Sequence, residues 1–251
     1  MRKINKLILL VIILFFFSTI TTNAQKVYKQ NPGFIFGFSY GYNVSGGDLS
    51  TRFGNNFKID VSPTFYFSGS NISVGIEASY IFSGKVKEHS FLNILTFDRH
   101  VINNNGTFAT IQTSERGVLF GGLISKIIPF NRNIRTGIKI EAGGYLFRHW
   151  ISFKTIGEIR QLTSDYLKGY DRLTGGLALK EFVGYQYLSE KSKINFYAGF
   201  EFYQGFTKSI RGYDYDKASV DNFARKDLLY GIKIGWILPL YIVKNPEEIY
   251  Y

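Results

Sequence analysis

The sequence predicts an all-β fold: an eight-stranded antiparallel up-and-down transmembrane β-barrel with four long outer loops and three short periplasmic turns. Three observations predict it. Apolar and polar residues alternate with a period of two, the alternating stretches are long, and short and long connections between them alternate along the chain. Alternation gives a strand two unlike faces. A tilted strand needs about ten residues to cross a bilayer, whereas strands of soluble sheets are usually nearer five or six.

Residues 1–24 are expected to be a secretory signal peptide. The start "MRKINK" is positively charged, "LILLVIILFFF" is an unbroken apolar run, and "TNA" supplies small residues before a cut at Gln25. This order is typical of a cleaved leader. The alternative is a retained anchor, but the apolar run is shorter than the roughly 20 residues of a spanning helix. The expected division is therefore leader 1–24, barrel 25–241 and a short periplasmic tail 242–251.

Composition favours a membrane barrel over a soluble exported protein. The chain has 24 Phe, 18 Tyr and 26 Gly but 5 Pro, and aromatic residues make up 18%. It has no cysteine, which excludes disulfides as the means of holding an exported chain together. Loss of the leader's three cations changes the net charge from +11 to +8. A basic surface suits anionic lipid headgroups or acidic partners; nucleic acid is rarely met by an exported chain.

Eight stretches carry the alternation, and we expect each to be a strand: 33–43, 56–68, 71–82, 116–128, 134–147, 173–188, 193–206 and 226–241. Three connections are short turns rich in Gly, Ser, Asn and charge: 68–71, 129–133 and 189–192. The other four are long: 44–55, 83–115, 148–172 and 207–225. Short turns on one side and long loops on the other are typical of outer-membrane barrels, which have an even strand number.

The alternation also predicts which side chains face lipid. In 193–206, the residues Ile194, Phe196 and Phe200 share one face, while Tyr197 and Glu201 share the other. In a barrel the apolar face meets lipid, and an eight-stranded lumen is just wide enough to be filled by side chains. We therefore expect inward-facing charges to pair in a lumen ion-pair network and to leave no wide pore: Lys58, Asp60, Glu77, Arg135, Lys139, Glu141, Glu201 and Lys233.

Three places interrupt this pattern. In 116–128 two sets of apolar residues compete, and the faces of that strand stay open. Lys180-Glu181 breaks the alternation of 173–188 and predicts a bulge. Pro63 removes a ladder hydrogen bond within 56–68 and predicts a bulge or local bend.

Aromatic residues predict two further features. One is a membrane girdle at the ends of the strands: Tyr80, Trp150, Trp236 and Tyr241. The other is a loop contact surface, in which apolar and Tyr side chains lie among polar residues: Phe91, Leu95, Phe97, Tyr166, Tyr170, Tyr213 and Tyr215. These loop residues either fold over the barrel mouth as a cap or contact a partner, and both interpretations stay open.

The final strand, "LLYGIKIGWILPLY", is similar to the terminal signal that barrel-assembly machinery reads, with glycines, alternating hydrophobic residues and a closing aromatic. On strand number, alternation and loop asymmetry, residues 33–241 resemble the small eight-stranded outer-membrane barrels of the OmpA-like transmembrane type. The "NAQ" cut site and the Phe/Tyr/Asn/Lys-rich composition look like exported proteins of Bacteroidota. The resemblance implies the outer membrane of a Gram-negative bacterium. The tail "IVKNPEEIYY" departs from it, since the signal usually ends the chain.

Some barrels of this type are enzymes that modify lipid A with Ser, His and an acid near the outer rim. The local approximation here is His149 with Ser152; the alternative is that Arg148, His149 and Trp150 form part of the girdle. We favour the girdle, so no catalytic residue is predicted. His89 and His100 lack the spacing of a metal pair, and no metal site or cofactor is predicted.

The functional expectation is a non-enzymatic barrel with a structural or interaction role, as a subunit or anchor of a larger envelope assembly for secretion or outer-membrane assembly. Its expected partners are outer-membrane lipids, lipopolysaccharide and an envelope protein bound through the outer loops or the tail; nucleic acid is not among them. The alternatives are a lipid A-modifying enzyme centred on His149 and a narrow channel. The alternative fold is a soluble β-sandwich.

Overall fold

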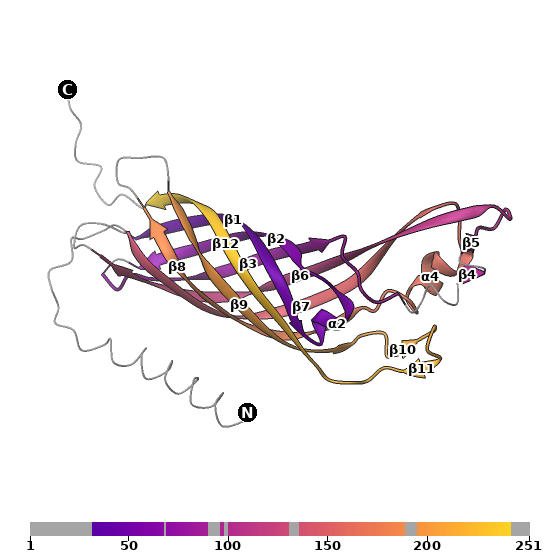
Figure 1. Cartoon of the computed structure of the whole chain (residues 1–251). Helices are drawn as coiled ribbons and strands as arrows, with labels where there is room; N and C mark the ends of the chain where they lie inside the picture. The colour runs from indigo at the N-terminus through magenta and orange to yellow at the C-terminus, as the bar shows by residue number, and fades with distance from the viewer. Residues whose placement is uncertain are drawn as a thin grey trace.

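The computed structural model describes residues 32–67, 69–89, 96–97, 100–130, 136–188 and 195–241. Its eight long strands are β1 (Gly33–Gly47), β2 (Asn56–Phe67), β3 (Ile72–Ser83), β6 (Phe108–Pro129), β7 (Gly137–Ile156), β8 (Thr174–Tyr187), β9 (Phe196–Ser209) and β12 (Arg225–Tyr241). Each pairs antiparallel with its neighbours in the order β3-β2-β1-β12-β9-β8-β7-β6, and pairing of β3 with β6 closes the ring (Figure 1). The predicted eight-stranded barrel is confirmed.

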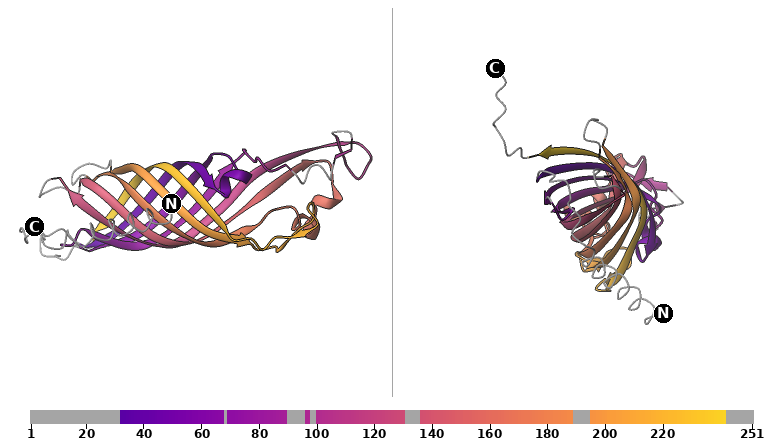
Figure 2. Two further views of the ribbon diagram at one scale, coloured as in Figure 1. Left: turned by 60° about the horizontal axis from the view of Figure 1, so that its bottom comes forward. Right: turned by 90° about the vertical axis from the view of Figure 1, so that its left-hand side faces the viewer.

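Two strands are much longer than predicted. β6 has 22 residues and β7 has 20, and they stay paired out to Thr110 and Ile156. Residues expected in the second and third long loops therefore form a two-stranded ribbon, the outer part of the β6–β7 hairpin, which runs beyond the rest of the ring (Figure 2). The short strands β4 (Thr96–Phe97) and β5 (His100–Ile102) continue its sheet, because β5 pairs with the far end of β6.

The remaining short elements all lie at the end of the barrel that carries the long loops, hereafter the outer end. They are α2 (Leu49–Arg52), η2 (Arg160–Leu162), α4 (Ser164–Leu167), β10 (Tyr213–Asp214) and β11 (Ser219–Val220). At the opposite end Gly33 pairs with Tyr241, so the first and last strands close the ring there. In the described ranges, no helix has the length and apolar character needed to span a bilayer.

Burial along the strands is the reverse of that in a soluble protein. Large apolar side chains are exposed all around the ring, among them Phe34, Ile59, Phe200, Ile232 and Trp236. Polar and charged side chains fill the interior. A closed ring satisfies the backbone hydrogen bonds of every strand, so it can lie in hydrocarbon, and the exposed apolar belt is the surface that hydrocarbon would cover.

The structure settles the faces left open in 116–128. Leu119, Leu123 and Ile127 point inward and are buried, whereas Phe120 and Ile124 are exposed on the outer wall. Alternation alone did not decide this because both faces of the strand are apolar. The inward Leu119 packs in one cluster with the lumen aromatics Tyr145 and Tyr203.

Both predicted bulges are absent. β8 pairs without interruption with β7 and β9 through Lys180 and Glu181, so the bulge expected there is wrong. Lys180 is buried and Glu181 is exposed, which continues the alternation. At Pro63 the pairing of β2 with β3 is interrupted, but the register is the same on both sides of the gap. The missing N–H therefore removes ladder bonds locally without inserting a residue.

Candidate functional site

The lumen holds a continuous chain of alternating charges. Lys58 lies 2.8 Å from Glu201 and 3.2 Å from Asp60. Lys233 follows, 3.1 Å from Asp60 and 2.9 Å from Glu77. The chain ends with Lys180, which bridges Glu77 (2.7 Å) and Glu141 (3.2 Å), and with Lys139, 2.6 Å from Glu141. Four cations and four anions thus neutralise one another.

Tyrosines complete the coordination of these charges. Lys58 donates a hydrogen bond of 2.6 Å to the hydroxyl of Tyr203, and its ammonium lies 4.4 Å from the centre of that ring. Tyr145 and Tyr203 donate to Glu77 at 3.2 and 3.3 Å. These groups are at most 2% exposed, so solvent does not reach the centre of the lumen. A buried ion network of this kind holds because every one of its charges has partners.

Seven of the eight residues predicted for the lumen network are members of this chain; Arg135 lies outside the described residues. The fourth cation is Lys180, which sequence reasoning missed. The signal was present: Leu177, Leu179 and Val183 are apolar and share the face of Glu181, so unbroken alternation places Lys180 inside. The prediction was wrong because the two adjacent charges were interpreted as an interruption of the alternation.

Above the charges, an apolar plug fills the outer end of the lumen. The helix α2 folds inward, and its Leu49 and the following Phe53 are 0% exposed. They pack with Phe147, Ile151 and Leu229 in one buried cluster. Phe53 also bridges to Val86 in the next loop, which fixes the helix between the loops and the wall.

His149 belongs to this plug and does not belong to a girdle. It is 1% exposed, its ring meets Phe53 edge-on at 5.6 Å, and its Nε2 lies 3.0 Å from Asp227. Placing it in the girdle is wrong, because odd-numbered residues of β7 point into the lumen. Ser152 lies on the opposite face of the strand, so the two side chains cannot act together on one substrate. Tyr80 and Trp236 are exposed on the outer wall and Trp150 is half-buried there, whereas the side chain of Tyr241 is outside the description.

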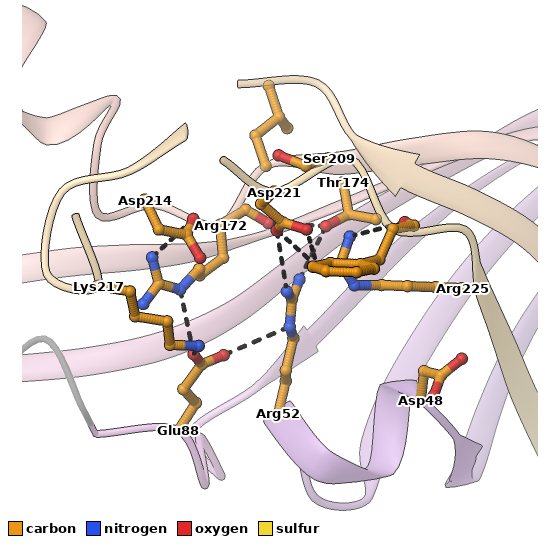
Figure 3. A network of polar contacts seen from close by, with 12 residues as sticks. Asp48, Arg52, Glu88, Arg172, Thr174, Ser209, Asp214, Lys217, Asp221 and Arg225 are labelled. Carbon is orange, nitrogen blue, oxygen red and sulfur yellow. Dashed lines mark hydrogen bonds and ion pairs between the residues drawn. The ribbon is translucent and has the colours of Figure 1, made fainter. Parts of the chain in front are cut away.

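The outer loops are tied together by a second ion network (Figure 3). We call residues 48–53, 84–89, 157–174 and 210–225 the outer cap. Arg172 lies at its centre, 3.1 Å from Glu88, 2.9 Å from Asp214 and 2.6 Å from Asp216. Arg52 lies 3.3 Å from the same Glu88 and donates to Thr174 at 2.9 Å. Four loop segments far apart in sequence thereby become one body.

The surroundings favour the charged forms of Glu88 and Arg172. Burial opposes ionisation of Glu88, but Arg172 and Arg52 outweigh it and hold the pKa of that carboxyl below its ordinary value. Burial disfavours the charge of Arg172 as well, yet its hydrogen bond to Asp216 and the charge of Glu88 raise its pKa. For Asp214 burial outweighs the attraction of Arg172, and its pKa is raised. Glu88 and Arg172 are therefore the pair that holds the cap together.

The predicted loop contact residues are divided by the structure. Tyr166, Tyr213 and Tyr215 are 57%, 41% and 48% exposed. Tyr170 is 7% exposed and packs edge-on against Tyr215 at 5.8 Å, so its assignment to an exposed surface is wrong: it is an interior residue of the cap. Phe97 ends the two-residue strand β4, and its side chain is outside the description; Phe91 and Leu95 lie outside the described residues.

No protein-family model matches the sequence, and no curated protein matches it. Solved structures give low-similarity matches. Neisserial surface protein A (NspA) is 12% identical with a TM-score of 0.42, over 82% of this chain and 99% of that one. The outer membrane protein OprG from Pseudomonas aeruginosa is 12% identical with a TM-score of 0.42, over 84% and 98%. Ail, the attachment invasion locus protein of Yersinia pestis, in complex with the heparin analogue sucrose octasulfate, is 8% identical with a TM-score of 0.39, over 83% and 100%.

At these identities and scores, nothing that those proteins bind or do transfers to this chain. The geometry itself carries the conclusion. A closed antiparallel ring, an exposed apolar belt and a neutralised polar lumen are the features of an outer-membrane barrel. The chain has the fold of a small transmembrane β-barrel of the outer-membrane type, with a filled lumen and a structured outer cap.

Proposed function

We propose that this barrel is a non-enzymatic anchor whose outer cap is a preformed contact surface for an envelope protein, and that it serves as a subunit of a larger envelope assembly. The filled lumen supports this role because it leaves little room for a solute or a substrate. The eight charges of its ion chain are paired, and those at its centre are shielded from solvent, which disfavours an ion path or a substrate cavity there. The groups left to make contacts lie at the outer end.

The observation that carries the proposal is the placement of Arg172. Its side chain has 0% exposure, and its guanidinium joins carboxylates from two other loops. Its backbone has φ of 51°, in the left-handed region that costs a non-glycine residue about 1 kcal/mol or more. A loop without tertiary contacts would relax from this backbone conformation. The strained conformation of Arg172 therefore fits a preorganised cap, which lowers the entropy cost of binding a partner.

Exposed apolar side chains on the same end supply the contact area. Phe108 and Ile156, at the far part of the β6–β7 hairpin, are 73% and 72% exposed, and Phe223 of the cap is 73% exposed. Exposed aromatic and apolar groups on an ordered frame are typical of protein contact surfaces. The tail 242–251 stays a second predicted route of contact. The leader, the Bacteroidota origin and contact with lipopolysaccharide likewise stay predictions.

The test compares Arg172→Met with Lys168→Gln in the full chain. Lys168 pairs with the exposed Asp165 on the surface of the same loop, so its loss leaves the cap intact. Each variant is extracted from its native membrane in mild detergent, and the proteins that co-purify are identified and quantified. We expect a protein retained by wild type and Lys168→Gln to be lost from Arg172→Met, while the barrel of all three keeps its heat-modifiable gel migration.

Two outcomes would overturn the proposal. One is a wild-type protein that purifies alone under gentle extraction. The other is a partner retained by Arg172→Met after proteolysis has shown that its cap is loose.

A further inference from the structure

Glu181 lies on the outer wall of the barrel, in the middle of β8, where a charge is unexpected. Its side chain is exposed, and it is far from both Thr174 and Tyr187, the ends of the strand. Its neighbours across the sheet are Ala142 of β7 and Phe202 of β9. A residue at the centre of a spanning strand that points outward meets the hydrocarbon core. Ionisable groups placed there are costly and mark functional sites.

The carboxylate of Glu181 has no donor within the barrel. In the described part of the chain, no hydrogen bond or ion pair joins it to another residue. Its sequence neighbour Lys180 shows the contrast, because that ammonium is buried between Glu77 and Glu141. Lipid chains carry no donor either. A cationic side chain of another protein would supply a donor for Glu181 at this depth.

The wall beside Glu181 is unusually flat. Gly122 pairs with Gly144, Gly144 pairs with Leu179, and Ala142 pairs with Glu181 itself. A Cβ on Gly144 would meet nothing within 4 Å, and one on Gly122 would meet a single backbone oxygen at 3.8 Å. Packing of the barrel therefore does not demand glycine at either position. Small residues on a lipid-facing surface let a second backbone approach closely.

On the other side of Glu181 the wall is hollowed. An apolar groove of about 630 Å³ runs from β8 across β9 and β12 to β1. Its lining includes Glu181 together with Val183, Phe200, Phe202, Tyr230 and Ile232. Flat wall, unpaired carboxylate and groove are thus contiguous on one side of the ring.

We propose that this side of the barrel is a lateral docking site for a transmembrane segment of a partner protein, which presents a Lys or Arg side chain to Glu181 within the bilayer. Gly122, Ala142 and Gly144 admit the partner's backbone, and the groove accepts its apolar side chains. Charge complementarity selects the occupant, because a Lys or Arg side chain can form an ion pair with the Glu181 carboxylate and acyl chains cannot. The site is separate from the outer cap and does not depend on the proposed function of the cap.

The test uses the absence of cysteine from the chain. A single Leu179→Cys variant, whose side chain is exposed on β8 next to Glu181 and outside the groove, is labelled with a benzophenone photoprobe and irradiated in the native membrane. We expect one cross-linked protein, joined through a transmembrane segment that contains Lys or Arg. The adduct should be lost when Glu181→Leu is added, kept with the conservative Glu181→Asp, and kept with Val61→Leu on the distant outer wall of β2. The same probe at Ile59, on β2 away from this wall, should give no such adduct.

A second measurement separates docking from a structural role. In purified protein reconstituted in lipid vesicles, Glu181→Leu should raise the urea midpoint of unfolding, because it removes a carboxylate that faces lipid and bonds to nothing in the barrel. Val61→Leu, on the outer wall of β2, should leave the midpoint unchanged. A lower midpoint for Glu181→Leu would assign the residue to barrel stability and overturn the proposal. So would a missing adduct, an adduct that Glu181→Leu does not affect, or an adduct with a second copy of this chain.

Discussion

The lumen network and the outer cap are both built from buried ion pairs, but they are positioned by different means. The lumen charges come from strands whose register is fixed by continuous backbone hydrogen bonds around a closed ring. The cap charges come from loops, and Arg172 and Glu88 are 84 residues apart without any shared strand pairing. The strands of the wall therefore position the lumen charges, whereas the cap charges hold their own loops in place. Loss of a lumen charge should destabilise the whole barrel, and loss of a cap charge should destabilise the cap alone.

The largest effect is expected from Glu77→Ala in the lumen. Glu77 bridges Lys180 and Lys233, and its removal leaves both ammonium groups short of a partner in a site that solvent does not reach. Breaking a buried pair in this way costs about 3–5 kcal/mol. We expect the free energy of unfolding to fall by that amount in urea titrations of protein in lipid vesicles. Ile76→Ala, which shortens an adjacent lipid-facing side chain, is the control and should cost less. Equal decreases in the free energy of unfolding for Glu77→Ala and Ile76→Ala would show that the ion chain does not stabilise the barrel beyond an ordinary side-chain truncation.

A smaller and more local effect is expected from Phe53→Ala in the apolar plug. Phe53 is 0% exposed, and removing a buried Phe side chain costs about 3–5 kcal/mol when the element is part of the global fold. Here α2 is held by loops, so we expect faster hydrogen exchange in 48–53 with exchange in the strands unchanged. Planar-bilayer recordings should stay silent, because the charge chain below the plug still fills the lumen. Ion conductance in this variant would show that the plug, and not the charges, closes the barrel.

Sequence predicted the lumen better than the cap for the same physical reason. A strand repeats its environment every two residues, so the positions of Lys58, Glu201 and Lys233 follow from the pattern once the ring is assumed. The prediction was wrong at the adjacent charges Lys180 and Glu181, where a bulge was expected although the alternation continues through both residues. It also left 116–128 undecided, because apolar residues line both of its faces.

The cap carries no such repeat. Nothing in the sequence indicates that Arg172 meets Glu88 or that Tyr170 is covered by Tyr215. The extension of β6 and β7 past the ring was missed for a related reason, since polar residues there alternate without a clear apolar face. Loop structure of this kind depends on contacts between distant segments, and those contacts appear when the ring brings the loop ends together.

The cap should also respond to acid, and the lumen provides the comparison. The folded pKa of Glu88 is lowered, so its contribution to stability is fully present above its unfolded pKa, near 4.3, and is lost as pH falls through the folded value. We expect the protection of cap amides, measured as the exchange rate relative to the intrinsic rate at the same pH, to fall at pH 3 relative to pH 6, while the protection of the strands is unchanged. Glu88→Gln should lower the protection of the cap at pH 6 and flatten its dependence on pH. A wild-type cap with the same protection at both pH values would contradict this assignment.

The smallest effect on function is expected from His149→Ala, which decides between a packing residue and a catalytic one. His149 is 1% exposed beneath Phe53, its Nε2 is engaged by Asp227, and Ser152 lies on the other face of β7. No lipid can reach its imidazole without unpacking the plug. The variant loses one buried hydrogen bond, a cost of about 1–3 kcal/mol in unfolding free energy, and the mass spectrum of lipid A from cells that carry it should match wild type. A changed lipid A profile, with the barrel still folded, would support the alternative that His149 is catalytic and would require that the plug opens.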